Sequence, residues 1–231
     1  MNQNPFGSRP RLRAGVMPGP FAGPASTSTS ATAYLKQVYA LVAASLLLSV
    51  VAGLIGMNSP FARENQLLLI FVQLGALLLA FWKKNTPTLF LFTGLSGFCL
   101  GPIIGFYVSQ GMSAVVGQAV LMTGLIFTGL SFYALTTKRD LSMIGGMLFA
   151  GLIVLVVGGL LNLFFQSTAV AFALSAAGAV IFSGYILWET QQLKDHPGLV
   201  PPAIAALSMY LNILNLFLSL LRMLGILGSD E

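Results

Sequence analysis

One acidic side chain stands directly behind a strongly apolar segment of this sequence. Glu189 follows AVAFALSAAGAVIFSGYIL, residues 169–187, which contains no charged residue. A carboxylate at this position is either an ordinary group at a membrane surface, accompanied by Trp188 and Lys194, or a group turned inward. Turned inward, it would bind a proton or a cation, or accept hydrogen bonds as a latch that closes one end of a helix bundle.

Five polar residues near the carboxyl end of the chain could face that carboxylate. Their spacing of 4, 3, 4 and 3 puts them on one face of a helix whose other residues are mainly Leu, Ile, Met and Phe. In a membrane such a polar stripe faces protein or water, because contact with lipid would leave its polar groups unpaired. We therefore expect this last helix to be central in a bundle. The polar stripe consists of Ser208, Asn212, Asn215, Ser219 and Arg222.

Residue counting favours Ser208 over Asn212 as the partner of Glu189. If two straight helices cross with level ends, Asn212 lies deeper than Glu189 by about seven residues, or roughly 10 Å. Glu189 and Asn212 meet only if the last helix tilts or its first turns protrude, and a length of about 26 residues permits either. Asn215 would lie one turn further along the same latch or ion path.

A second candidate chemistry is peptide hydrolysis inside the membrane. Residues 94–97 spell GLSG, the GxSG pattern of rhomboid-type intramembrane serine proteases, which need a histidine base on a second helix. The single histidine, His196, lies in a loop, whereas Ser96 should lie about 12 Å inside the membrane. We therefore expect a packing serine and no catalytic residue. One histidine and one cysteine leave no transition-metal ligand set, and no cofactor is implied.

The composition places most of the chain in lipid. The sequence is 56% hydrophobic and 7% charged, whereas soluble proteins contain about 25% charged residues. Runs of about 20 apolar residues, enough to cross a bilayer core, recur along the chain, and the alternation of a transmembrane β-barrel is absent. We predict an all-α membrane protein in which residues 34–228 form seven transmembrane helices. The predicted spans are residues 34–56, 65–82, 88–109, 113–136, 141–165, 168–192 and 202–227.

Residues 1–33 differ from the rest of the chain. They are rich in Pro, Gly, Ser and Thr and contain three arginines, so we predict a flexible basic tail. With the amino terminus inside, nine of the eleven basic residues lie on the cytoplasmic side. Seven spans then put the carboxyl terminus outside, unless the last span is a re-entrant loop. The net charge of +5 follows from this asymmetry and gives no indication of nucleic acid.

Small residues predict close contacts between helices. Gly97, Gly101 and Gly105 recur every four residues, which leaves one face of the third span as bare backbone. Gly146 and Ala150 form a similar pair in the fifth span. We expect both sets to pack against neighbouring helices without taking part in chemistry.

Four segments together resemble the transmembrane Bax-inhibitor motif family, and in particular its bacterial YccA-like branch. The resemblance covers residues 34–228 and implies a seven-helix fold with the last helix at the centre. The segments are SFYALTTKRDLSMIGGML (131–148), SGYILWETQQL (183–193), MYLNILNLFLSLLRMLG (209–225) and GFCLGPIIGFY (97–107).

The resemblance implies two different functions. Some members are pH-sensitive calcium leak channels, in which acidic residues on the sixth and seventh helices form a latch with a basic residue on the second. Glu189 matches the first acidic position, but Asn212 occupies the other, and residues 66–82 contain no basic residue. A titration that needs two coupled carboxylates therefore does not carry over, and a lone carboxylate is weak support for calcium, which usually gathers several.

YccA-like members are inner-membrane proteins that bind and modulate the ATP-dependent protease FtsH. Such a protease starts on a flexible segment that the cytosol can reach, and residues 1–33 could supply one. A tightly packed bundle behind that tail would be a slow substrate that occupies the protease. We favour this function in the bacterial inner membrane, with FtsH and the lipid bilayer as partners. The alternative is a pH-regulated calcium or proton leak.

Overall fold

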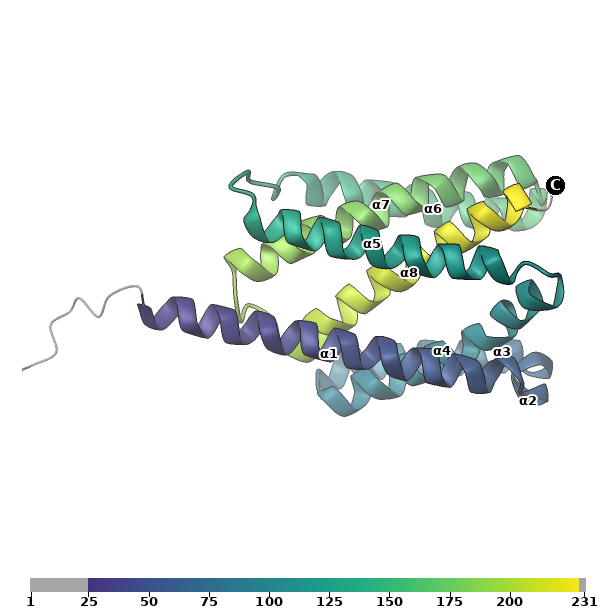
Figure 1. Cartoon of the computed structure of the whole chain (residues 1–231), viewed down its shortest axis with the longest axis horizontal. Coiled ribbons are helices and arrows are strands. Elements are labelled where there is room, and N and C mark those ends of the chain that lie inside the picture. The colour runs from purple at the N-terminus through teal and green to yellow at the C-terminus, as the bar shows by residue number, and fades with distance from the viewer. Residues whose placement is uncertain (1–24, 229–231) are drawn as a thin grey trace, which may run out of the picture.

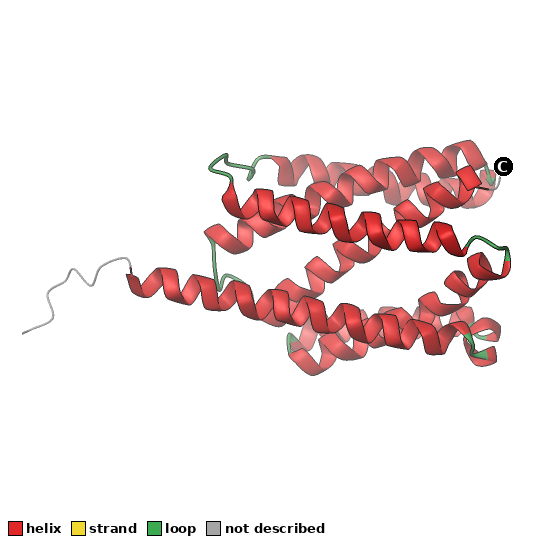
Figure 2. Cartoon of the chain, viewed as in Figure 1, coloured by secondary structure: helices red, strands yellow, loops and turns green. Residues whose placement is uncertain are grey.

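Helices make up nearly all of the described chain. The structure, a computed structural model, describes residues 25–228, and these contain no strand (Figure 2). The helices are α1 (Ala25–Met57), α2 (Pro60–Glu64), α3 (Gln66–Lys83), α4 (Thr86–Ser109), α5 (Ser113–Thr136), α6 (Ile144–Phe165), α7 (Thr168–Asp195) and α8 (Pro202–Gly228).

Seven of these helices are long and apolar enough to cross a membrane, and α2 is the short exception. Their order and bounds follow the seven predicted spans closely, because each run of about 20 apolar residues forms one helix that satisfies its own backbone. The predicted all-α, seven-helix membrane fold is confirmed.

The first helix begins earlier than its predicted span. Residues 25–33 of the predicted tail are the first turns of α1, and residues 1–24 lie outside the described residues. The Ala, Ser and Thr residues of this stretch extend a helix that the apolar turns behind them already nucleate. The 33 residues of α1 measure about 50 Å at the helical rise, so α1 projects beyond the other helices (Figure 1).

The last helix occupies the centre of the bundle. In Figure 1, α8 crosses obliquely between a group formed by α1, α3 and α4 and a group formed by α5, α6 and α7. It contacts α1, α4, α5 and α7, and 56% of its apolar window is buried, against 6% for α6. It is one continuous helix, so it crosses the bundle and does not return as a re-entrant loop.

Tyr210 joins α8 to the first group of helices. Its side chain is fully buried, and its hydroxyl lies 2.8 Å from Ser49 Oγ on α1. The same hydroxyl donates to the backbone oxygen of Thr93 on α4 at 3.4 Å. The ring meets Phe92 edge to face, with centroids 6.1 Å apart. One side chain thus satisfies its polar group and fills the junction of three helices.

Gly97, Gly101 and Gly105 of α4 lie against α1, and we call this contact the glycine seam. A Cβ atom on Gly97 would overlap the backbone of Ser49, and a Cβ atom on Gly101 would overlap the backbone of Met57. At Gly105 the Cβ atom would lie 3.0 Å from the flexible Met57 side chain. The two helices therefore approach to backbone contact at Gly97 and Gly101, where only glycine fits.

The second predicted packing pair does not form a contact. A Cβ atom added to Gly146 would have no neighbour within 4 Å, and Gly146 and Ala150 are both exposed. The neighbouring Gly145 faces α7 instead, where its Cβ atom would lie 2.8 Å from the indole of Trp188. The prediction was wrong because spacing identifies a small-residue face without showing which way it points.

Replacing Gly101 by alanine should destabilise the bundle by at least about 1–3 kcal/mol, the usual cost of overpacking, because backbone rather than a flexible side chain blocks the new methyl group. Unfolding in detergent micelles measures the change. Gly124→Ala is the matched control, since no atom lies within 4 Å of its Cβ position. It should be neutral or stabilising, because alanine favours helix. Equal losses for both variants would contradict the glycine seam.

Candidate functional site

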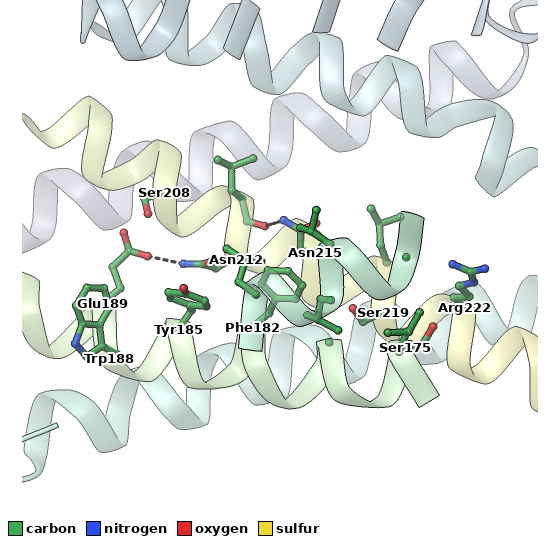
Figure 3. Close-up of a pocket in the computed structure, with 18 residues that line it drawn as sticks. Ser175, Phe182, Tyr185, Trp188, Glu189, Ser208, Asn212, Asn215, Ser219 and Arg222 are labelled. Atoms are coloured by element: carbon green, nitrogen blue, oxygen red, sulfur yellow. Dashed lines mark hydrogen bonds between the residues drawn. The ribbon is translucent and has the colours of Figure 1, made fainter. Parts of the chain in front are cut away.

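Two hollows lie along α8. The first, which we call the Glu189 cleft, has a volume of about 640 Å³ and runs between α6, α7 and α8 (Figure 3). The second, which we call the Arg222 cavity, has a volume of about 710 Å³ and lies where α4, α6, α7 and α8 come together near the end of α8. Among the described residues, only Arg222 lines both hollows. Together they follow α8 over most of its length.

The polar stripe of α8 lines the Glu189 cleft along its whole length. All five of its residues face the cleft, and Figure 3 shows them in order from Ser208, near Glu189, to Arg222 at the far end. Helix α7 contributes Ser175 and Tyr185 from the opposite wall. The first four residues of the stripe are partly buried, as their polar groups require, whereas Arg222 is exposed at the far end of the cleft.

Glu189 meets Asn212 directly. The Nδ2 atom of Asn212 donates to Oε2 of Glu189 at 2.6 Å, and the glutamate is only 8% exposed. The oblique course of α8 in Figure 1 brings the two residues to one level although straight helices would separate them. Ser208 is the second polar neighbour of the carboxylate. The structure thus brings together both residues that the sequence analysis weighed as partners.

Asn215 lines the cleft without reaching the carboxylate. Its Nδ2 atom donates to the backbone oxygen of Leu211, one turn back in α8, at 2.8 Å. The donor is therefore used within the helix, and the residue adds polarity to the wall of the cleft. The hydrogen-bonded unit at this end consists of the carboxylate and its neighbours on α8.

This arrangement suits a hydrogen-bonded latch between α7 and α8 better than a multidentate cation site. One carboxylate faces an amide and a hydroxyl, and Arg222, the one basic residue among the described residues that line the cleft, lies at its other end. Among residues 25–228, no three His, Cys, Asp or Glu side chains gather as metal ligands would. A calcium ion usually requires several carboxylates among six to eight oxygen ligands.

The end of α7 also holds the connection between α5 and α6. Gln191 Oε1 accepts from the backbone N–H of Leu141 at 2.7 Å, and its Nε2 donates to the backbone oxygen of Arg139 at 2.6 Å. Lys194 donates to two carbonyl oxygens at the end of α5 at 3.0 and 3.1 Å. The sequence analysis missed Gln191, although a glutamine at the end of an apolar helix indicates an inward hydrogen bond.

Ser96 and His196, the two residues of the protease pattern, do not form a nucleophile and base pair. Ser96 is fully buried in α4, and its hydroxyl accepts from Gln73 Nε2 at 3.0 Å. His196 is exposed and follows the last residue of α7. The serine therefore joins α4 to α3 and has no base beside it.

Comparison with known proteins identifies the family. The model of the family described as "Inhibitor of apoptosis-promoting Bax1" matches residues 31–229, which is nearly the entire helical part of the chain. The chain belongs to the Bax inhibitor-1 family. The expected resemblance is therefore confirmed, and the chain is a multi-pass membrane protein.

Individual relatives span bacteria and mammals. "Modulator of FtsH protease YccA" of Escherichia coli K12 is 36% identical over 200 residues, which covers 85% of this chain and 91% of that protein. An uncharacterized membrane protein of Vibrio cholerae is 37% identical over 205 residues, covering 85% of this chain and 91% of the relative. "Protein lifeguard 4" of Mus musculus is 34% identical over 204 residues, covering 83% and 84%.

Replacing Asn212 by leucine should lower the free energy of unfolding by about 1.5–3 kcal/mol, because the buried carboxylate loses a charge-assisted hydrogen bond. A double-mutant cycle with Glu189→Gln should reveal coupling between the two positions. Asn215→Leu makes the same change on the same stripe without contact to Glu189, and should show no coupling. Independent effects of Asn212→Leu and Glu189→Gln would contradict the latch.

Replacing Gln191 by alanine should increase amide hydrogen exchange in residues 137–143, because the loop loses two hydrogen bonds to α7. Mass spectrometry of the protein in nanodiscs would measure the rates. Gln192→Ala is the matched control, since its side chain makes no hydrogen bond within the described chain. If both variants exchange at the wild-type rate, Gln191 does not hold the loop.

Proposed function

We propose that this protein binds the membrane protease FtsH as a slow substrate and thereby modulates the turnover of other membrane proteins. The observation that carries the proposal is the 36% identity, over 85% of the chain, to a relative named as a modulator of that protease. Membership of a family described as an inhibitor supports a regulatory role over a catalytic one. The two residues of the protease pattern also lie apart.

The sequence ahead of α1 offers a starting point for proteolysis. Residues 1–24 are rich in Pro and Gly and precede the long first helix. A protease that begins there would next have to extract α1, which contacts α4 at the glycine seam and also contacts the central α8. Packing of backbone against backbone would resist extraction, and such resistance is what makes a substrate slow and therefore inhibitory.

The proposed location is the bacterial inner membrane with the start of α1 in the cytoplasm. Six basic residues lie toward one end of the bundle, and two lie toward the other. The positive-inside rule favours the first end as cytoplasmic, which puts the end of α8 on the periplasmic side. The six are Lys36, Lys83, Lys84, Lys138, Arg139 and Lys194, and the two are Arg63 and Arg222.

Degradation of an independent membrane substrate by FtsH in vesicles tests the proposal. The full-length protein should slow that degradation and be consumed slowly. Removal of residues 1–24, which leaves α1 intact, should yield a protein that still binds FtsH, persists, and represses degradation more strongly. A variant with the order of residues 1–24 shuffled keeps length and composition, and should behave as wild type. If neither the full-length nor the truncated form binds FtsH or alters the rate, the proposal fails.

A regulated cation or proton leak is the second candidate, and the Glu189 cleft favours it. A polar wall runs along α8 from Glu189 to Arg222, where the Arg222 cavity begins. Opening of the contact between Glu189 and Asn212 would then control one end of the path. Flux through the purified protein in liposomes tests this function. Glu189→Gln should change the flux or its pH dependence, and Asn215→Leu should not affect the pH dependence. If Glu189→Gln leaves both the flux and its pH dependence unchanged, this mechanism is excluded.

A further inference from the structure

Arg222, an exposed cation in the last turns of α8, has no acidic partner among residues 25–228. It lies six residues before the end of α8, or roughly 9 Å along the helix. Within residues 25–228 its guanidinium makes no ion pair or hydrogen bond. An arginine at such a depth faces a cavity or a counter-charge, because lipid contact is unfavourable. The Arg222 cavity supplies the space, and its other polar groups indicate what kind of ligand fits there.

Asn162 presents a free hydrogen-bond donor to the same cavity. Its side chain is 8% exposed, and its Oδ1 atom accepts from the backbone N–H of Ser167 at 3.1 Å. This bond fixes the orientation of the amide, so Nδ2 is the group left for a ligand. Nδ2 has no partner within the described residues. An amide nitrogen and a guanidinium that line one cavity without partners among the described residues favour an anionic oxygen ligand.

The described residues that line the rest of the cavity include no aspartate or glutamate. Thr168, the first residue of α7, is one of them. In the first turn of that helix the N–H of Val170 donates to Ser167 Oγ at 3.4 Å. The N–H groups of Thr168 and Ala169 are therefore the ones left with partial positive charge.

Tyr107 also lines the cavity and contributes its phenol hydroxyl. Its ring packs against α8 at Gly225, which lies one turn after Arg222 and has no side chain to block the ring. All of these groups are compatible with an anion.

The cavity borders the surface that lipid covers. Two apolar side chains that line it, Phe106 and Leu163, are 61% and 70% exposed. A ligand that binds here from the membrane would place its polar group near the helix ends and its chains along these side chains. We propose that the Arg222 cavity binds the phosphate headgroup of an anionic phospholipid, with Arg222 and Asn162 donating hydrogen bonds to phosphate oxygens.

Native mass spectrometry of the full chain in micelles tests this site. The probes are phosphatidylglycerol, which carries a net negative charge, and phosphatidylcholine, whose ammonium would face Arg222. The wild type should retain the first about tenfold more strongly, because both lipids offer phosphate oxygens but Arg222 repels the choline ammonium of the second. Arg222→Gln should abolish most of this preference, and Arg222→Lys should keep part of it. Circular dichroism confirms that each variant is folded.

Arg63→Gln is the matched control. Arg63 lies toward the same end of the bundle but donates to the backbone oxygen of Met57 at 2.8 Å, so its loss should leave the preference intact. An equal loss for both arginine variants, or none for Arg222→Gln, would overturn the proposal. Displacement of the lipid by millimolar inorganic phosphate would assign the site to a free anion instead. A last variant carries both Asp230→Asn and Glu231→Gln. If only this variant prefers phosphatidylglycerol, then Arg222 pairs with these acidic residues in the wild type, and the proposal is overturned.

Discussion

The requirement that polar groups be satisfied inside a membrane governs this structure. Helix α8 carries five polar side chains on one face, and lipid offers no hydrogen-bond partners to such a face. The helix is therefore surrounded, with the α1, α3 and α4 group on one side and the α5, α6 and α7 group on the other (Figure 1). Tyr210 secures the first side through Ser49 and Thr93, whereas the contact between Glu189 and Asn212 secures the second. The location of both hollows follows from the same constraint.

The helices and the central position of α8 could be predicted from the sequence because both depend on local patterns. Apolar length determines the spans, and the period of the stripe determines which face of α8 is polar. The contact between Glu189 and Asn212 could not be predicted firmly, because it depends on the crossing angle of two helices that are separated by a loop. Counting residues along straight helices favoured Ser208, and the oblique course of α8 brought Asn212 into direct contact.

Other differences have similarly specific causes. Gly97 and Gly146 both belong to small-residue patterns, yet of the two only Gly97 contacts the backbone of another helix. The spacing predicts a face of small residues but does not predict which helix packs against it. Gln191 was missed because its hydrogen bonds go to a loop about 50 residues away in the sequence. Arg222 was recognised as part of the stripe, but its place between two hollows emerges only when α4 and α6 are positioned around it.

The length of α1 has a consequence for whatever acts on the chain ahead of it. A helix of about 50 Å exceeds a hydrocarbon core of about 30 Å, and α1 projects beyond its neighbours on the side where it begins (Figure 1). Such a helix acts as a rigid spacer. It fixes the height above the bilayer at which residue 25 is presented, and a membrane-anchored partner must match that height to reach the chain. Helix geometry would therefore help to select such a partner, in addition to sequence recognition.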